Sequence, residues 1–267
     1  MMNTMVLSLS ALISLLPATV LPFARSAVKA DLVFWLLLGA AIAGPTGYSL
    51  AVLAGHWESN LPAALWLAVA VSLALYALVV LLAREAFRLA PLLLPYALVL
   101  GALGTALAPL NVDLGPATDV DAWLAVHIAV SVATYGLCTL AAVAAAAAFI
   151  QETALKRRSP SGFTRMLPSV SDAEWLVLRL LIAAEVVLGL GIVTGISKLY
   201  VSSGAILNLD HKTLLSLLAF LFIALLLFLH HRSGLRGRRA ARLVLIAYLL
   251  LSLAYPGVKF VTDYLLA

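Results

Sequence analysis

The sequence is poor in charge and in cysteine. Charged residues make up only 11% of its 267 residues, whereas 64% are hydrophobic and the mean hydropathy is +1.10. A soluble domain of this length cannot bury so much apolar surface, because a soluble core needs a polar shell. The single cysteine, Cys138, excludes an intramolecular disulfide and a cysteine metal cluster. No long alternation of polar and apolar residues indicates a barrel, so the composition predicts an all-α integral membrane protein.

Apolar runs recur from one end of the chain to the other, and each approaches the roughly 20 residues that a helix needs to cross a bilayer. The polar stretches between them are too short for a second folded domain. We therefore predict one polytopic membrane domain over residues 1–267, a bundle of about eight transmembrane helices. The first run lacks a basic start and a cleavage site, so we expect it to be a retained helix. The expected spans are roughly 4–23, 32–54, 62–83, 91–109, 122–149, 175–198, 212–231 and 240–264.

The basic residues are unevenly distributed over the connections. Fourteen of the 17 Lys and Arg residues lie in or beside the first, third, fifth and seventh connections, and only Lys198, Lys212 and Lys259 lie on the other side. Basic residues mark cytoplasmic loops. We therefore predict that both termini are extracytoplasmic, and that the high pI reflects this topology and contact with lipid, not nucleic acid. The stretch "RSGLRGRRAARL" at 232–243 is an orientation signal or contacts anionic headgroups.

A histidine in a membrane helix needs a reason, and a neutral imidazole is a good axial ligand for haem iron. This topology places His127 near the outer face. Trp123 and His127 are four residues apart and share a helix face, so they could supply an iron ligand and an aromatic wall for a porphyrin. Alternatively, Trp123 sits at the headgroup level and His127 only bonds a neighbouring helix.

The stretch "DHK" at 210–212 precedes the seventh apolar run. Asp210 suits a helix N-cap and Lys212 can extend to the headgroups, but neither explanation accounts for His211, also at the outer face. A haem slot between the fifth and seventh spans, with His127 and His211 as facing ligands, is one hypothesis. In the other, His211 lies in the headgroups and the two helices pack without a slot.

Glu185 is the carboxylate nearest the middle of a span. An intramembrane acid indicates a functional site such as a proton carrier, or a structural acid bonded to a neighbouring helix; in either case we expect it to be protonated. Gly191 and Gly195 form a small-residue patch, and "AAVAAAAAF" at 141–149 forms a small-residue surface. Both predict close helix packing.

Several of these segments together resemble a known family. "W-x3-H-I-x2-S-x3-Y", "FIQETALKRR", "LPSVSDAEWLVLRL", "DHKTLLSLLAF" and "GLRGRRAARLVLIAYLLLSLAYPGVKFV" are similar to the cytochrome c assembly superfamily, which includes CcsA, ResC, CcmC and HemX-like proteins. The likeness covers about residues 60–267 and is closest to the small eight-span, inner-membrane YpjD-like branch.

The resemblance implies a haem-handling protein with haem b as the cofactor. His127 matches the first outer histidine of the family. "NLDHK" falls where a tryptophan-rich segment ends in Trp-Asp-Pro-Lys, so Asp210 and Lys212 match and His211 replaces the proline. His230 resembles the histidine of the "LHxR" element. The implied site is therefore Trp123, His127, Asp210, His211, Lys212 and His230, with His127 and His211 on the iron.

Departures from the family pattern weaken the expectation of a complete haem–cytochrome c synthase. The stretch "LYVSSGAILNLD" has no tryptophan, and "YPGVKFV" lacks the second outer histidine. Haem binding or presentation at the outer face, without enzymatic activity, is the main hypothesis. The alternative is a cofactor-free accessory or regulatory protein that binds a transporter or a haem-synthesis partner. A proton-coupled carrier using Glu185 is a third hypothesis, though no internal repeat supports it.

Overall fold

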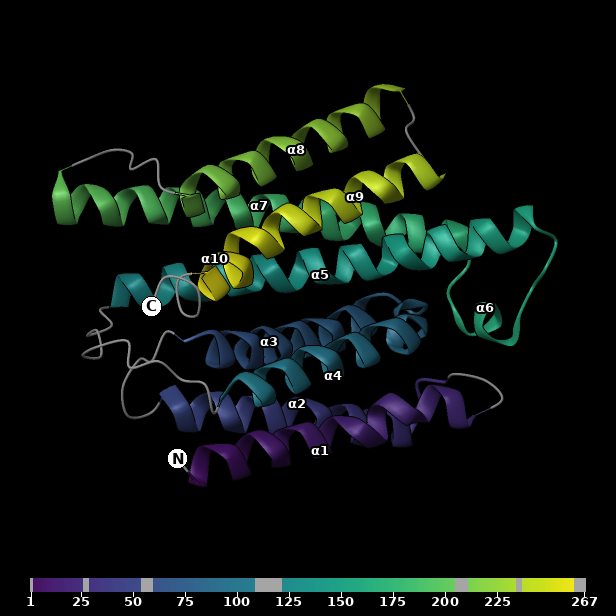
Figure 1. Cartoon of the computed structure of the whole chain (residues 1–267). Coiled ribbons are helices and arrows are strands. Elements are labelled where there is room, and N and C mark those ends of the chain that lie inside the picture. Colours follow the sequence, from purple (N-terminus) through teal and green to yellow (C-terminus); the bar gives the residue numbers. More distant parts are fainter. Residues whose placement is uncertain are drawn as a thin grey trace.

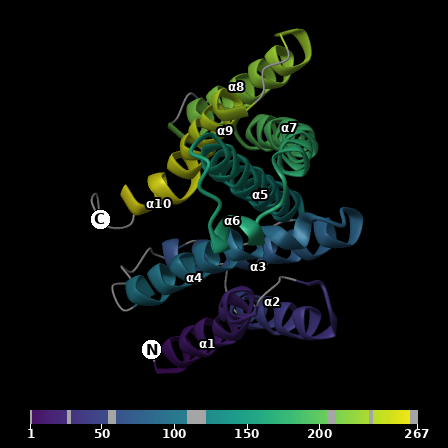
Figure 2. The same cartoon turned by 90° about the vertical axis from the view of Figure 1, so that its right-hand side faces the viewer.

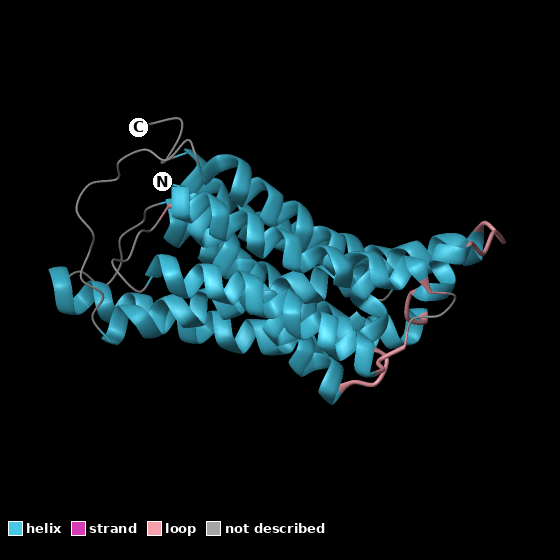
Figure 3. Cartoon of the chain, turned by 90° about the horizontal axis from the view of Figure 1, so that it is seen from below, coloured by secondary structure: helices cyan, strands magenta, loops and turns pink. Residues whose placement is uncertain are grey.

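Helices make up almost all of the described chain. The structure is a computed structural model that describes residues 2–25, 29–53, 60–108, 122–204, 211–233 and 237–261, and these ranges contain no strand. The helices run side by side along the molecule (Figures 1 and 3). The elements are α1(Met2–Ala24), α2(Leu32–Leu53), α3(Leu61–Leu82), η1(Ala86–Leu89), α4(Ala90–Leu107), α5(Ala122–Lys156), α6(Gly162–Met166), α7(Val170–Ser203), α8(His211–Ser233), α9(Gly237–Ser252), η3(Leu253–Gly257) and α10(Val258–Phe260). The predicted class, an all-α membrane protein, is confirmed.

Seven helices in the described ranges are long and apolar enough to cross a membrane, namely α1 to α5, α7 and α8, with η1 joined to α4. The eighth predicted span, 240–264, corresponds to α9, η3 and α10. Its first part, α9, has only 16 residues, and the π-helical turn η3 contains Pro256. Proline cannot donate the backbone hydrogen bond of a regular α-helix, which accounts for the local change of helical type there.

α5 and α7 are longer than the sequence predicted, with 35 and 34 residues. Each is about 50 Å long, well beyond the roughly 30 Å of a hydrocarbon core. Hydropathy marks only the apolar part of a helix, so it misses polar turns such as "QETALK" that continue the same helix.

α5 lies at the centre of the second half of the bundle. It packs on α7 and α9 and meets α3, whereas α1 and α2 pack together and cover α4 and α3 on the far side. α8 is outermost and packs on α7 and α9 (Figure 2). Ala141, Ala144, Ala145 and Ala147 of α5 are completely buried. Small side chains let helix backbones approach closely, so the predicted role of this alanine run is confirmed.

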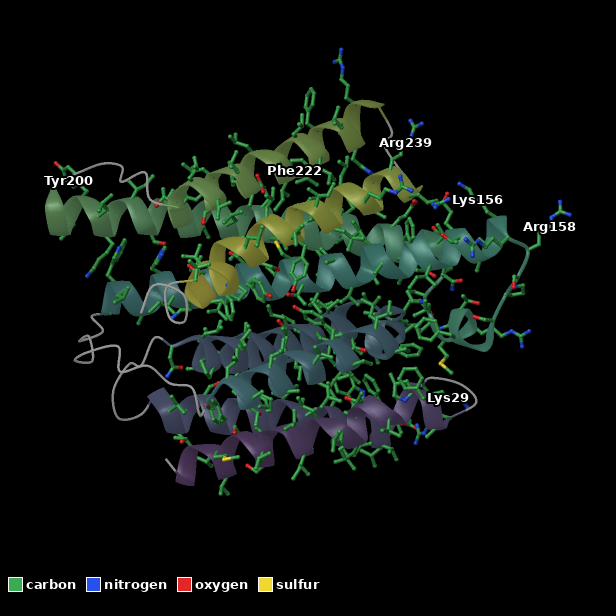
Figure 4. The ribbon with its side chains drawn as sticks, in the orientation of Figure 1. Lys29, Lys156, Arg158, Tyr200, Phe222 and Arg239 are labelled. Atoms are coloured by element: carbon green, nitrogen blue, oxygen red, sulfur yellow. The ribbon has the colours of Figure 1, made fainter. Side chains whose placement is uncertain are left out.

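The two ends of the bundle differ in charge. Lys29, Lys156, Arg158 and Arg239 lie at one end, termed the basic end, and Tyr200 lies at the other, termed the outer end (Figure 4). α1 begins and α10 ends at the outer end (Figure 1). This grouping follows from the alternation of the spans. That the basic end faces the cytoplasm remains a prediction from the distribution of lysine and arginine.

Gln151 fixes the long connection between α5 and α7 to α5. Its side-chain amide Nε2 lies 2.8 Å from the carbonyl oxygen of Thr164 and 3.0 Å from that of Pro168. Ser161 begins α6 with a reciprocal pair of side-chain bonds to Thr164. The amide thus ties carbonyl groups at and just after the end of the short helix α6 to α5.

Three tyrosines join the two halves of the bundle. The Tyr248 hydroxyl of α9 donates to the Tyr135 hydroxyl of α5 at 3.1 Å. The Tyr96 hydroxyl of α4 is 3.3 Å from that of Tyr135 and is also bonded to that of Tyr248. Each phenol has one hydrogen and accepts at its oxygen. The three bonds can therefore close into a ring in which every hydroxyl donates once and accepts once.

Candidate functional site

His127 is held against α7 by Thr194 at the outer end. The imidazole Nδ1 lies 3.1 Å from Thr194 Oγ1, and the Thr194 hydroxyl donates to the carbonyl oxygen of Gly191 at 3.0 Å. The threonine has a single hydroxyl hydrogen, which this second bond uses. When the Thr194 hydrogen points to the Gly191 carbonyl, Nδ1 carries the ring hydrogen and donates it to Thr194. In the neutral ring this leaves the lone pair on Nε2, the nitrogen that can bind a metal.

The glycine patch brings α7 close to the His127 ring. A Cβ added at Gly195 would lie 3.1 Å from His127 Cε1, and one added at Gly191 would lie 3.5 Å from a methyl carbon of Val130. The first distance is tighter than ordinary van der Waals contact, so any larger residue at Gly195 would displace the imidazole. The predicted packing role of the two glycines is confirmed, and their partner is the helix that carries His127.

Trp123 is anchored to the same threonine as His127. Its indole N–H donates to the carbonyl oxygen of Thr194 at 3.1 Å, while 46% of its surface remains exposed. His127 is also partly exposed. One alternative from the sequence was that His127 bonds a neighbouring helix, and the structure contains this bond, to Thr194 of α7. It occupies Nδ1 only, so Nε2 and an aromatic surface one turn away remain available for a ligand.

The structure does not describe the side chains of the other predicted outer residues. Asp210 lies outside the described residues. His211 and Lys212 are the first residues of α8, and the placement of their side chains is likewise outside the description. α8 packs on α7 and α9, which in turn pack on α5 (Figure 2). A slot between α5 and α8 would therefore have α7 and α9 as its side walls.

Two cavities within the described part of the chain test whether a porphyrin could be enclosed. Their volumes are about 30 and 10 Å³, and His127 lines neither of them. Pockets for small molecules measure roughly 300–1,000 Å³. The described residues therefore fit haem in their chemistry, through one imidazole whose Nε2 can bind iron, and neither of these two cavities encloses that nitrogen.

His230 belongs to a different site at the basic end. It lies 19 residues after His211 on α8, which is about 28 Å along the helix axis. It lines the 30 Å³ cavity with Glu174 and Gly237, and the Gly237 N–H donates to Glu174 Oε1 at 2.7 Å. That volume suits one water molecule. His230 and the outer histidines thus cannot share an iron.

Glu185 has no hydrogen-bond partner among the residues that the structure describes. Both of its carboxyl oxygens are covered, although the residue as a whole is only partly buried. A charged, unpaired carboxylate inside a bilayer is costly, so the geometry fits a neutral acid.

Thr194 is the site residue that the sequence analysis missed. A hydropathy pattern does not mark a single threonine in an apolar run as a site residue. The available signal was its position between Gly191 and Gly195, since a polar side chain inside a close-packing patch must bond to the helix that packs there.

The fold defines the class of the protein as an all-α integral membrane protein, with a partly exposed histidine at one end of the helical bundle. Residues 58–266 match the family described as cytochrome C assembly protein, and the chain belongs to that family. It is also 50% identical, over the full length of both chains, to the "Uncharacterized 28.8 kDa protein in nifR3-like 5'region" of Azospirillum brasilense. No solved structure matches the chain. Family membership supports a haem-related role in cytochrome c biogenesis.

Proposed function

We propose that this protein binds haem b at its outer end through His127 Nε2, and that it holds or presents the haem during cytochrome c assembly. The observation that carries the proposal is the hydrogen bond between Nδ1 and Thr194, because it occupies Nδ1 and leaves Nε2 as the nitrogen that can bind iron. Family membership supplies the ligand class. The proposed setting is the bacterial inner membrane, as in the YpjD-like branch.

The remaining site residues take roles that follow from their chemistry. Trp123 offers an aromatic face beside the ligand nitrogen, and His211 is the proposed second iron ligand. Asp210 is proposed to cap α8 and to orient a ligand ring. Lys212, and Lys198 one turn beyond Thr194, are proposed partners for the haem propionates, because a cation pairs well with a carboxylate.

We propose a haem-handling role without complete synthase activity. The chain lacks tryptophan in the segment 199–210 and lacks a histidine in "YPGVKFV". A synthase must both hold haem and position the cysteine thiols of its protein substrate, and these departures remove aromatic surface and a ligand from the outer face. The haem is thus cargo that the protein orients and passes on.

The test is the absorption spectrum of the full-length protein purified in detergent, with a pyridine haemochrome assay for haem type and amount. Wild type is expected to show a Soret band with non-covalent haem b. His127→Ala should lose most of it, whereas His231→Ala, which removes an exposed histidine at the opposite end, should not. A wild type that stays colourless after haem is added would refute haem binding and favour the cofactor-free accessory role. Equal loss in both variants would exclude His127 as the ligand.

A further inference from the structure

Two arginines of α9 rest on one aromatic ring of α5. The guanidinium carbon of Arg238 lies 4.9 Å from the centre of the Phe149 ring, and that of Arg242 lies 6.0 Å from it. Arg238 and Arg242 are four residues apart and so occupy the same face of α9. Stacking on an aromatic face attracts a cation and restricts its side chain. The two guanidinium groups are therefore held side by side at the basic end.

Their hydrogen-bonding groups are not satisfied by the neighbouring acids. Glu152 pairs with Lys156 at 2.8 Å, and Glu174 accepts the N–H of Gly237 at 2.7 Å. The salt bridges recorded in the described ranges include neither arginine of the pair. Arg238 Nε is covered and has no hydrogen-bond partner. Arginine does not lose its proton in proteins, so an anion is the group that would complete this site.

An exposed apolar stripe continues from the arginine pair along α9. Ile246, Leu249 and Leu253 follow Arg242 at spacings of three and four residues, and 45%, 57% and 49% of their surfaces are exposed. Ile246 and Leu249 thus lie on the face of α9 that carries the two arginines, and Leu253 follows at the start of η3. This face combines two cations at the level of the membrane surface with apolar surface toward the membrane centre. That combination matches a molecule with an anionic head and a hydrocarbon tail.

We propose that Arg238 and Arg242, seated on Phe149, bind the phosphate headgroup of an anionic phospholipid whose acyl chains lie along this stripe. The guanidinium groups donate paired hydrogen bonds to the phosphate oxygens. The site differs from the diffuse attraction that any basic loop has for an anionic membrane, because it needs the Phe149 ring. It is independent of the haem proposal, since it lies at the opposite end of the bundle.

The test measures the phosphatidylglycerol that the purified full-length protein retains from mixed vesicles of phosphatidylglycerol and phosphatidylcholine, by native mass spectrometry. Arg238→Gln and Arg242→Gln should each lower retention about tenfold, the equivalent of the roughly 1.5 kcal/mol that a hydrogen bond to a charged group contributes. Arg239→Gln is the matched control, since it removes the same charge from an exposed neighbour that is not stacked on Phe149. It should leave retention nearly unchanged.

Phe149→Leu changes no charge and is the deciding variant. It should lower retention as the arginine variants do, and Phe149→Tyr, which keeps the ring, should restore it. Equal losses in all three arginine variants, with none in Phe149→Leu, would overturn the proposal in favour of diffuse attraction. If inorganic phosphate stabilised the delipidated protein as well as phosphatidylglycerol does, the site would belong to free phosphate. Should Phe149→Leu not fold, the comparison of Arg238 and Arg242 with Arg239 decides alone.

Discussion

Replacing Tyr96 with phenylalanine should loosen the contact between the two halves of the bundle. The change removes one hydroxyl and keeps the ring, so the apolar packing of α4 is preserved. Tyr96 takes part in two of the three bonds of the tyrosine ring, to Tyr135 and to Tyr248. The third bond, from Tyr248 to Tyr135, can persist without it.

The size of the effect follows from the number of bonds lost. Hydrogen bonds between membrane helices contribute about 0.6 kcal/mol on average and reach about 1.7 kcal/mol. Losing two of them should therefore lower the free energy of unfolding by about 1 kcal/mol, and by at most about 3 kcal/mol. Tyr248→Phe should cost about as much, because Tyr248 also takes part in two of the three bonds.

Unfolding in mixed micelles with increasing sodium dodecyl sulfate measures this free energy. Tyr200→Phe is the control, since that side chain is 60% exposed at the outer end of α7. A double-mutant cycle on Tyr96 and Tyr248 should give a coupling energy of about 0.6 kcal/mol. If Tyr96→Phe unfolds like Tyr200→Phe, or if the cycle shows no coupling, the closed ring of hydroxyls does not stabilise the fold.

Three further predictions concern the site and the topology. Thr194→Val should weaken haem binding about tenfold, because it removes the partner that orients a ligating histidine, and Thr194→Ser should restore the affinity. Titration of the purified protein with haem measures both affinities. An unchanged affinity in Thr194→Val would exclude Thr194 as the group that orients His127. Glu185→Gln should keep the melting temperature of wild type, and Glu185→Lys should prevent folding. The reason is that the covered carboxyl oxygens have no hydrogen-bond donor and so fit a neutral group. A large loss of stability in the glutamine variant would show that the acid is charged. Ser161→Cys and Ser203→Cys, each in a background without the native cysteine, should react with an impermeant thiol reagent from opposite sides of the membrane, and reaction from one side would overturn the topology.

Much of the fold could be predicted from the sequence because hydropathy is a local property. About 20 apolar residues suffice to specify a spanning helix, whatever the rest of the chain does. Seven of the eight predicted spans correspond to helices that meet this requirement, and the predicted close packing at the alanine run and at Gly191 and Gly195 is confirmed. The lengths of α5 and α7 were underestimated, because a helix continues through polar residues that hydropathy excludes.

The candidate site was only half predictable. The sequence identified His127 and Trp123 through their spacing and their family pattern, and it could not identify Thr194, which lies 67 positions after His127. Inside a bilayer, lipid is as apolar as a neighbouring helix, so the pattern of apolar residues does not specify which helices meet. Partners such as Thr194 depend on that choice.

By itself, the sequence determined that this chain is a helical membrane protein, that its charge is concentrated in alternate connections, and that a histidine lies near one end of the bundle. Only the tertiary structure decided that His127 meets Thr194 through Nδ1, that Tyr96 meets Tyr248 across 152 positions, and that two arginines share the Phe149 ring. The physical reason is that hydrophobicity and charge act on each segment separately through the membrane. A hydrogen bond or a ring contact requires two particular atoms to meet, and the packing of the helices brings them together.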